Sequence, residues 1–256
     1  DAWSRALPLA PFQTLTLHEP AEVQTTGYML YDANRLYIGV RCEEPRPGAM
    51  KTTVEKRDGP VYGDDCIEIF LVPPNSPILV RFEERIQYFH LVINPLGTRY
   101  DEIGMNSPAA FTADWQAETT IGDDYWSLEI ALPFSAFDVD AGAGDVWRGN
   151  ISRSRTVEPA YTTWAPLVRS FHDRDNFGQI VFTRDAAATA ARIEELEFEA
   201  LMNGLLTPRM EALDSALDDL AERAADLPRI AREDAVRMVS RLIGRQRNMQ
   251  FGLERL

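Results

Sequence analysis

Glu68 is an acidic side chain in the middle of an apolar segment, VYGDDCIEIFLVPP (residues 61–74), where it stands between Ile67 and Ile69. The segment is rich in β-branched residues and is predicted to be a strand. A carboxylate at the centre of such a strand either points away from the hydrophobic core or is buried with a partner, because an unpaired buried charge is costly. Glu68 is therefore the first candidate for a binding residue.

Carboxylates are also abundant elsewhere, and several stand in or near expected turns. The acids concerned are Asp58, Asp64, Asp65, Asp101, Asp123, Asp124 and Glu129. A glycosidase needs two such groups that face each other across a cleft, and spacing alone does not show that arrangement. Acid pairs before strands are more often turn or cap residues, or oxygen ligands for calcium. The acids alone therefore give no evidence for catalysis.

The sequence lacks the common motifs of catalytic and nucleotide-binding sites. It contains no G-x-S-x-G, no P-loop, no H-E-x-x-H and no C-x-x-C. The histidines His18, His90 and His172 are scattered along the chain, which favours structural roles for them over catalytic ones. We therefore expect a protein without enzymatic activity of its own.

The charge of the chain excludes two classes of partner. The 256 residues include 40 acidic and 26 basic side chains, which gives a net charge of −14. Nucleic acids and anionic membrane surfaces both favour basic patches, so neither is expected as a partner. No apolar run approaches the ~18 residues of a membrane-spanning helix. Neutral ligands and divalent cations remain compatible with this composition.

Residues 1 to 183 have the pattern of a β-protein. Short segments rich in β-branched and aromatic residues are separated by Asp, Asn, Gly and Pro, with no helical pattern between them. The expected strands are TGYMLYD, NRLYIGVRC, CIEIFLV, YFHLVIN, WQAETTIG, YWSLEIALP, WRGNISRSR, YTTWAPL and GQIVFT. They predict a mainly β fold, an antiparallel β-sandwich of the jelly-roll or immunoglobulin-like kind. Cys42 and Cys66 lie in two of these strands and are expected to be buried thiols.

The hydrophobic period changes after Thr183. Apolar residues then recur every three or four positions, which predicts amphipathic helices at about 185–203, 208–226 and 229–251. The expected domains are therefore a sandwich over residues 1–183 and an appended α-helical segment over residues 184–256. Its helices could pack on each other or on the sandwich, or could form a homodimer or dock another domain.

Eight segments occur in the order W-S-R-A-L…F, YDANRLYIGVRCEEP, RDGPVYGDDCIEIFL, VINPLGTRYD, WSLEIALPF, WRGNISR, TTWAPL and FHDRDNFGQIVF. This series resembles the strand motifs of the family 9 carbohydrate-binding modules and their relatives with DOMON-like sandwich folds. The strongest match is an aromatic residue and acids that lead into a Glu-Ile-Phe strand. The resemblance covers residues 1 to 183 and implies a non-catalytic module that binds carbohydrate and belongs to a larger polysaccharide-acting protein.

The resemblance also implies a sugar-binding site. In the family, two aromatic rings hold a terminal sugar between them, and the matching positions are Tyr62, six residues before Glu68, and Phe171, six residues before the Phe-Gly pair. Glu68 and Asn150 match the side chains that bind sugar hydroxyls. The chemistry is consistent with this role, because flat rings cover the apolar faces of a pyranose while carboxylates and amides bind its hydroxyls.

The sequence departs from the family at this site. Both ring positions are tryptophan in the family's well-studied members, and the arginine expected two residues before the turn asparagine is Val92 here. These changes imply weaker binding or a preference for another sugar. The alternative is that the two rings are ordinary loop aromatics and that Glu68 pairs with Arg57 or Arg153. The five tryptophans are expected in the core.

Two other functions stay open at this stage. Sandwiches of this kind also host haem, and Met29, His90 and Met105 are candidate axial ligands, although none falls in a recognisable motif. A structural or interaction module without a ligand is the third alternative.

The resemblance further implies a metal and a location. Family members carry structural calcium, and the acids of EEP at 43–45 and of residues 58–65 offer oxygen ligands at loop spacing. Calcium is therefore an expected ligand. A chain that begins DAWSRALPLAPF, without an initiator Met, has the start expected of a mature or trimmed product or of one part of a larger protein. The expected location is secreted, periplasmic or on the cell surface.

Overall fold

The computed structural model describes residues 2–80, 87–104, 111–185 and 250–253. The chain divides into two compact units, residues 1–189 with 251–256 and residues 190–250. All the elements described below, apart from Gln250, belong to the first unit. The helices predicted after Thr183 lie almost entirely outside the described residues, so they stay predictions.

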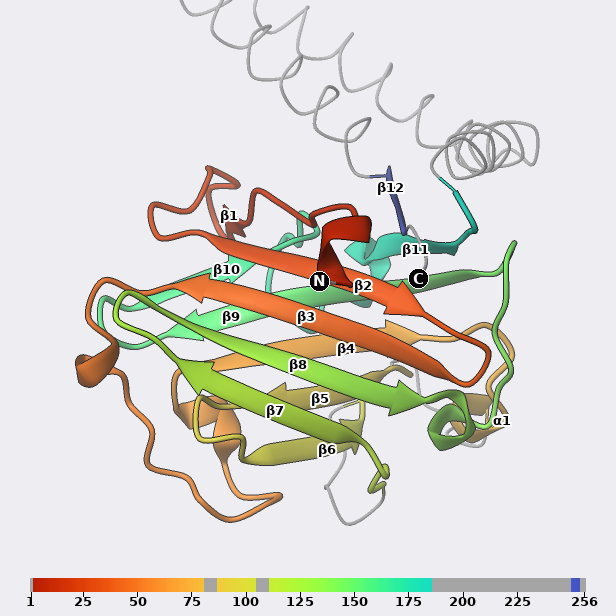
Figure 1. Cartoon of the computed structure of the whole chain (residues 1–256), viewed down its shortest axis with the longest axis horizontal. Coiled ribbons are helices and arrows are strands. Elements are labelled where there is room, and N and C mark those ends of the chain that lie inside the picture. The colour runs from red at the N-terminus through yellow and green to blue at the C-terminus, as the bar shows by residue number, and fades with distance from the viewer. Residues whose placement is uncertain (1, 81–86, 105–110, 186–249, 254–256) are drawn as a thin grey trace, which may run out of the picture. The chain divides into compact units, whose positions relative to one another are not determined.

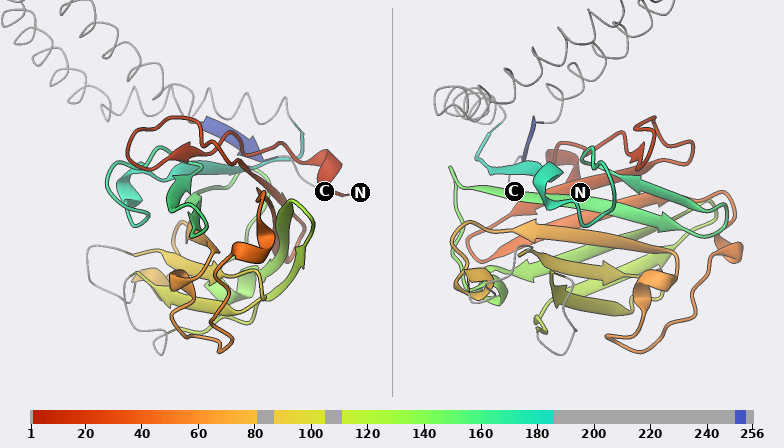
Figure 2. Two further views of the ribbon diagram at one scale, coloured as in Figure 1. Left: turned by 90° about the vertical axis from the view of Figure 1, so that its left-hand side faces the viewer. Right: turned by 180° about the vertical axis from the view of Figure 1, so that it is seen from behind.

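Two antiparallel sheets form the predicted sandwich. The smaller sheet contains, in spatial order, β2 (Thr25–Tyr31), β3 (Arg35–Glu43), β8 (Tyr125–Pro133) and β7 (Gln116–Ile121). The larger sheet contains, in spatial order, β1 (Gln13–Thr14), β10 (Ala160–Thr163), β9 (Val146–Arg155), β4 (Cys66–Val72), β5 (Phe89–Ile93) and β6 (Arg99–Ile103). Figure 1 shows the smaller sheet in front, and the right-hand view of Figure 2 shows the larger sheet from behind.

Two further strands extend the larger sheet. β11 (Gly178–Phe182) pairs with β9, and β12 (Gln250–Leu253) pairs with β11. The expectation that the chain is helical from residue 185 to its end is therefore wrong for residues 250–253. The free edge of β11 offers unpaired backbone groups that a short strand satisfies, and a glycine at position 252 is a poor helix former.

In the part of the sandwich that the structure describes, helical structure is confined to single turns. These are the α-helical turn α1 (Pro77–Val80) and 3-10 turns at Trp3–Arg5, Pro47–Ala49, Val61–Gly63, Phe134–Phe137 and Arg174–Asn176. Throughout the described residues, no helix has both the length and the apolar character that a membrane span requires.

The core lies between the two sheets. Alternate residues of β8, namely Trp126, Leu128, Ile130 and Leu132, are buried, as expected for a strand with one face on the core. β4 differs, because all residues from Cys66 to Leu71 are buried. Both faces of β4 are therefore covered, one by the smaller sheet and the other by loops.

The structure confirms most of the expected core. Cys42 and Cys66 are buried free thiols. Four of the five tryptophans, Trp115, Trp126, Trp147 and Trp164, are buried. Trp3 is half-buried and lies over Gly39 on the outer face of the smaller sheet, where an added Cβ would meet its ring at 3.0 Å.

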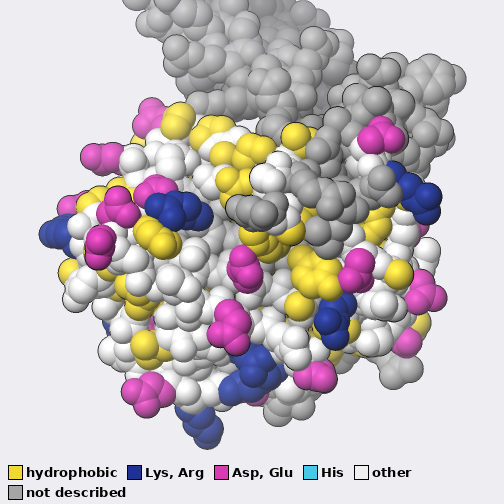
Figure 3. Space-filling model, viewed as in Figure 1, with side chains coloured by type: hydrophobic (Ala, Val, Ile, Leu, Met, Phe, Trp, Pro, Cys, Tyr) yellow, Lys and Arg dark blue, Asp and Glu magenta, His cyan; other side chains and the backbone are white. Residues whose placement is uncertain are grey.

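The outer face of the smaller sheet carries a shallow groove. Its lining includes Trp3, Tyr28, Arg41, Tyr125 and Glu129, and the Arg41 guanidinium lies 3.7 Å from the centre of the Tyr125 ring. Figure 3 shows this face of the molecule, on which acidic and basic side chains are interspersed and form no large patch of a single charge. The groove thus lacks a concentrated charge that would select an ionic ligand.

Candidate functional site

The register of the larger sheet places polar side chains from three strands on one face. Phe70 on β4 lies opposite His90 on β5, and His90 lies opposite Glu102 on β6. Directly opposed residues share a face, as do residues two apart along a strand. Glu68, His90 and Glu102 therefore all project from the same side of the sheet.

That side faces away from the core between the sheets. Ile69 lies opposite Ile151 on β9, and the Ile151 side chain approaches Gly27 of the smaller sheet. The alternate position, Glu68, must then point the other way. The sequence reasoning that a glutamate here avoids the core is consistent with this register.

Glu68, His90 and Glu102 form a buried hydrogen-bonded group, which we call the acid–imidazole cluster. His90 Nε2 lies 2.9 Å from Glu68 Oε2, and His90 Nδ1 lies 2.9 Å from Glu102 Oε1. The Tyr100 hydroxyl donates to Glu102 Oε2 at 2.7 Å, and the Ser154 hydroxyl donates to Glu68 Oε1 at 3.3 Å. One imidazole thus joins two carboxylates that are each 6% exposed.

The environment of His90 favours its charged form. Burial alone would lower the pKa of His90, but the hydrogen bonds to Glu102 and Glu68 outweigh burial and raise the pKa above its usual value. The ring also stacks on Phe70, with centroids 4.4 Å apart and planes 9° apart. His90 is therefore held in one orientation between two carboxylates that favour its charged form.

The acid–imidazole cluster lies in the wall of a cavity of about 530 Å³. This volume is within the usual range for small-molecule sites. Two predicted site residues, Tyr62 and Phe171, line the same cavity as Glu68, although they come from distant loops. Three of the four positions implied by the family resemblance therefore converge.

The ring exposure differs from the sequence-based expectation. Tyr62 is 54% exposed, whereas Phe171 is only 7% exposed. Phe171 packs edge-on against Tyr161, which lines the same cavity and is 60% exposed. The two rings most available to a ligand are therefore Tyr62 and Tyr161. Tyr161 was missed because the sequence shows a strand aromatic but not its exposure.

Asn150 is outside the cavity lining and is fully engaged by the protein. Its Oδ1 accepts hydrogen bonds from the Thr163 hydroxyl at 3.0 Å and the Ala165 amide at 2.8 Å. Its Nδ2 donates to the Ser152 hydroxyl at 2.6 Å. Asn150 is fully buried, so it holds the chain after β10 against β9 and does not face a ligand.

Glu68 pairs with neither of the two arginines named as alternative partners, Arg57 and Arg153. Arg57 binds Asp101 at 2.6 Å and Arg153 binds Glu44 at 3.2 Å, so the alternative pairing predicted for Glu68 is wrong. Val92, which replaces the arginine expected from the family, is buried directly opposite Glu68. Arg169, from the loop before Phe171, lines the cavity.

Three of the acids expected to bind calcium, Asp64, Asp65 and Glu44, already have protein partners. Asp64 accepts hydrogen bonds from the backbone amides of Thr53 and Val54, each at 2.8 Å. Asp65 accepts from the Lys51 amide at 2.8 Å. Glu44 pairs with two arginines and, like Asp64 and Asp65, is fully buried. A calcium ion would have to displace these donors, so the three acids do not fit a calcium site. Calcium binding stays a prediction, and these acids do not supply its ligands.

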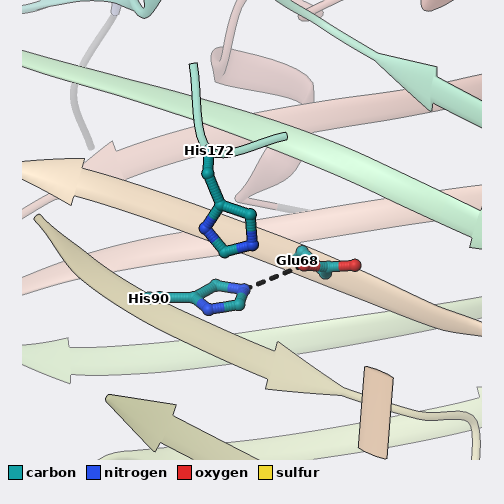
Figure 4. A group of neighbouring side chains, drawn as sticks. All are labelled: Glu68, His90 and His172. Carbon is teal, nitrogen blue, oxygen red and sulfur yellow. Dashed lines mark hydrogen bonds and ion pairs between the residues drawn. The ribbon is translucent and has the colours of Figure 1, made fainter. Parts of the chain in front are cut away.

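Two histidines that looked scattered in the sequence meet at the cavity. His172 lies beside His90, with ring centroids 5.2 Å apart. One ligand atom each from Glu68, His90 and His172 lie within 4.8 Å of one another, and Figure 4 shows the three side chains converging. Burial and the charge of His90 lower the pKa of His172, so this ring is neutral at neutral pH. These residues could hold a metal ion.

The candidate haem ligands do not converge in this way. Met29 is fully buried in the core on β2. His90 lies instead on β5, in the wall of the cavity, whose lining does not include Met29. Met105 lies outside the described residues.

Solved structures with the same fold support the predicted resemblance. The chain is similar to a family 9 carbohydrate-binding module from Caldicellulosiruptor kristjanssonii in complex with glucose, with a TM-score of 0.52 and 13% identity over 73% of this chain and 89% of that one. The complex with cellotriose gives a TM-score of 0.50 and 14% identity over 73% and 88%. A candidate carbohydrate-binding protein from Bacteroides uniformis gives a TM-score of 0.51 and 16% identity over 69% and 85%.

These identities are low, so the similarity establishes the fold. No family model matches the sequence, and no curated protein matches it. The chain is thus a β-sandwich with the fold of the family 9 carbohydrate-binding modules, as its strand motifs predicted.

Proposed function

We propose that this chain is a non-catalytic carbohydrate-binding module whose ligand is a neutral sugar bound in the cavity beside Glu68. The observation that carries the proposal is the convergence of exposed rings and a buried carboxylate in one cavity. Tyr62 and Tyr161 are more than half exposed at its edge, and Glu68 lies in its wall. Tyr161 on β10 is far in the sequence from Tyr62 and Glu68, so sequence proximity does not account for its position beside them.

The chemistry of the cavity suits a pyranose. The two tyrosine rings offer flat apolar surface to the C–H faces of a sugar. Glu68 and Glu102 supply carboxylate acceptors for hydroxyls, and Arg169 supplies donors at the opening. Solved structures of the same fold carry glucose and cellotriose, so short gluco-oligosaccharides are the first ligands to test.

The arrangement of the acids favours binding over hydrolysis. A glycosidase places two carboxyl groups on either side of the scissile bond. Glu68 and Glu102 instead lie on one face of the sheet and share one imidazole. The proposal also includes export and attachment to a larger polysaccharide-acting protein, which is the setting in which such a module brings a catalytic domain to its substrate.

Changing Glu68 to glutamine is expected to weaken sugar binding by at least about 1 kcal/mol, because the side-chain shape is kept while charge-assisted hydrogen bonds are lost. Calorimetric titration with short gluco- and xylo-oligosaccharides, in EDTA, measures this effect. Glu118→Gln is the matched control, since Glu118 is exposed on β7 in the other sheet. Equal affinities of Glu68→Gln and Glu118→Gln would contradict a ligand-facing role for Glu68.

A further inference from the structure

Glu68, His90 and His172 have the composition of a transition-metal site. One carboxylate and two imidazoles converge at the cavity, with their ligand atoms within 4.8 Å of one another. Calcium and magnesium prefer all-oxygen ligands, whereas two imidazoles with a carboxylate suit zinc and related first-row ions. The donor set therefore points to a different metal from the calcium expected in loops.

The surroundings of both histidines match those of metal ligands. A metal-binding histidine commonly donates its second ring N–H to a carboxylate or another oxygen, which fixes the ring and leaves the other nitrogen for the metal. His90 Nδ1 is bonded to Glu102 Oε1 at 2.9 Å, and His172 Nδ1 is bonded to the Tyr88 hydroxyl at 2.6 Å. Nε2 of His172 is then the nitrogen available for a metal, and Nε2 of His90 becomes available when a metal replaces its hydrogen bond to Glu68.

The supporting groups are themselves held in place. Glu102 accepts a second hydrogen bond, from the Tyr100 hydroxyl at 2.7 Å. Tyr88 is fully buried and packs against Phe70 with ring centroids 5.7 Å apart. Both imidazoles are therefore oriented by partners that do not themselves belong to the donor set.

We infer that Glu68, His90 Nε2 and His172 Nε2 bind one Zn²⁺ ion, with a further coordination position open to the cavity. Zinc bonds of about 2.0–2.1 Å in a tetrahedron place ligand atoms roughly 3.3 Å apart. His90 Nε2 and Glu68 Oε2 lie 2.9 Å apart, close to this spacing. His172 is in a loop between β10 and β11, so its ligand atom can move from within 4.8 Å of the others to this spacing without moving a strand.

The ion would replace a proton. His90 Nε2 donates to Glu68 when the ring is charged, and zinc binding releases that proton and occupies the lone pair. Three protein ligands and an open position are the usual arrangement of a zinc ion that contacts a ligand in a cavity. This inference does not depend on sugar binding, since the metal can be titrated without sugar and the sugar can be titrated in EDTA.

The test is titration of the tag-free, chelator-treated protein with Zn²⁺ by calorimetry and with Co²⁺ by visible absorption. One ion per chain is expected, and Co²⁺ should give the d–d absorption of a site with nitrogen ligands. His172→Asn should weaken Zn²⁺ binding more than tenfold. His18→Asn is the matched control, because His18 contacts the Leu167 carbonyl and is outside the cavity lining.

Tyr88→Phe tests the positioning role of the hydroxyl. The ring and its packing are kept, so Zn²⁺ affinity should fall about tenfold or more while the melting temperature without metal changes little. Failure of the wild type to bind a stoichiometric ion would overturn the inference. Unchanged binding in His172→Asn would do the same, because it would place the ion elsewhere.

Discussion

Replacing Glu44 by alanine is expected to lower the free energy of unfolding by about 3–5 kcal/mol, because it removes the buried carboxylate with which two buried arginines pair. Glu44 is fully buried, and its Oε2 is 2.6 Å from Arg155 Nε and 3.2 Å from Arg153 Nη2. Its Oε1 accepts from Arg155 Nη2 at 3.0 Å. Chemical denaturation at neutral pH measures the change.

The neighbouring acid supplies the control for this change. Glu43 pairs with Arg41, and both side chains are more than 40% exposed. Exposed pairs contribute only about 0–1 kcal/mol, so Glu43→Ala should have a small effect. A similar loss of stability in the two variants would contradict the claim that burial gives the Glu44 pair its importance.

Replacing Asp64 by asparagine is expected to lower the free energy of unfolding by about 3 kcal/mol at neutral pH. The carboxylate holds the loop that leads to Tyr62, because it accepts the amides of Thr53 and Val54 and the Asn94 side chain, the last at 3.0 Å. All three donors bind the same oxygen, Oδ2, so asparagine keeps an acceptor for them but loses the charge that strengthens these bonds. Its amide nitrogen also replaces the oxygen that accepts from the Thr53 hydroxyl at 2.8 Å.

The effect of Asp64 should depend on pH. Burial alone would raise the pKa of Asp64, but hydrogen bonds from Val54, Thr53 and Asn94 outweigh burial and lower it. The contribution of Asp64 to the free energy of unfolding is thus present above the unfolded-state pKa of 3.8. It is lost as the pH falls through the lower pKa of the folded state. The difference in the free energy of unfolding between wild type and Asp64→Asn should therefore become smaller below pH 3.8. The control is Asp123→Asn, at an exposed position, which should have the stability of wild type at every pH. A difference that stays constant down to acid pH would contradict this account.

The sandwich could be predicted because its strands carry the signal locally. In β8 the alternation of Trp126, Leu128 and Ile130 with polar residues sets the period within the strand itself. β6 (Arg99–Ile103) was missed because Arg99, Asp101 and Glu102 read as a polar turn. Asp101 is nevertheless fully buried, since Arg57 and the Ala113 amide satisfy it. The burial of Asp101 in β6 therefore depends on partners from other parts of the chain, which the local sequence pattern does not show.

The site was only partly predictable for the same reason. Glu68 and His90 are both polar residues in the middle of buried strands, so His90 carried a signal that sequence reasoning could have used. Asn150 carried the same signal, yet its partners are backbone and hydroxyl groups of the chain after β10. His172 lies in a loop, and nothing local in the sequence shows that it reaches Glu68.

The most direct test of the sugar-binding account is calorimetric titration of wild type, Tyr62→Ala and Tyr28→Ala with short gluco- and xylo-oligosaccharides. Tyr62 lines the cavity at Glu68, whereas Tyr28 lines the groove on the smaller sheet, so the pair distinguishes the two faces. We predict that Tyr62→Ala loses about 1–3 kcal/mol of binding free energy and that Tyr28→Ala binds as wild type does. Loss of binding in Tyr28→Ala alone, or no binding by wild type at millimolar sugar, would contradict the account.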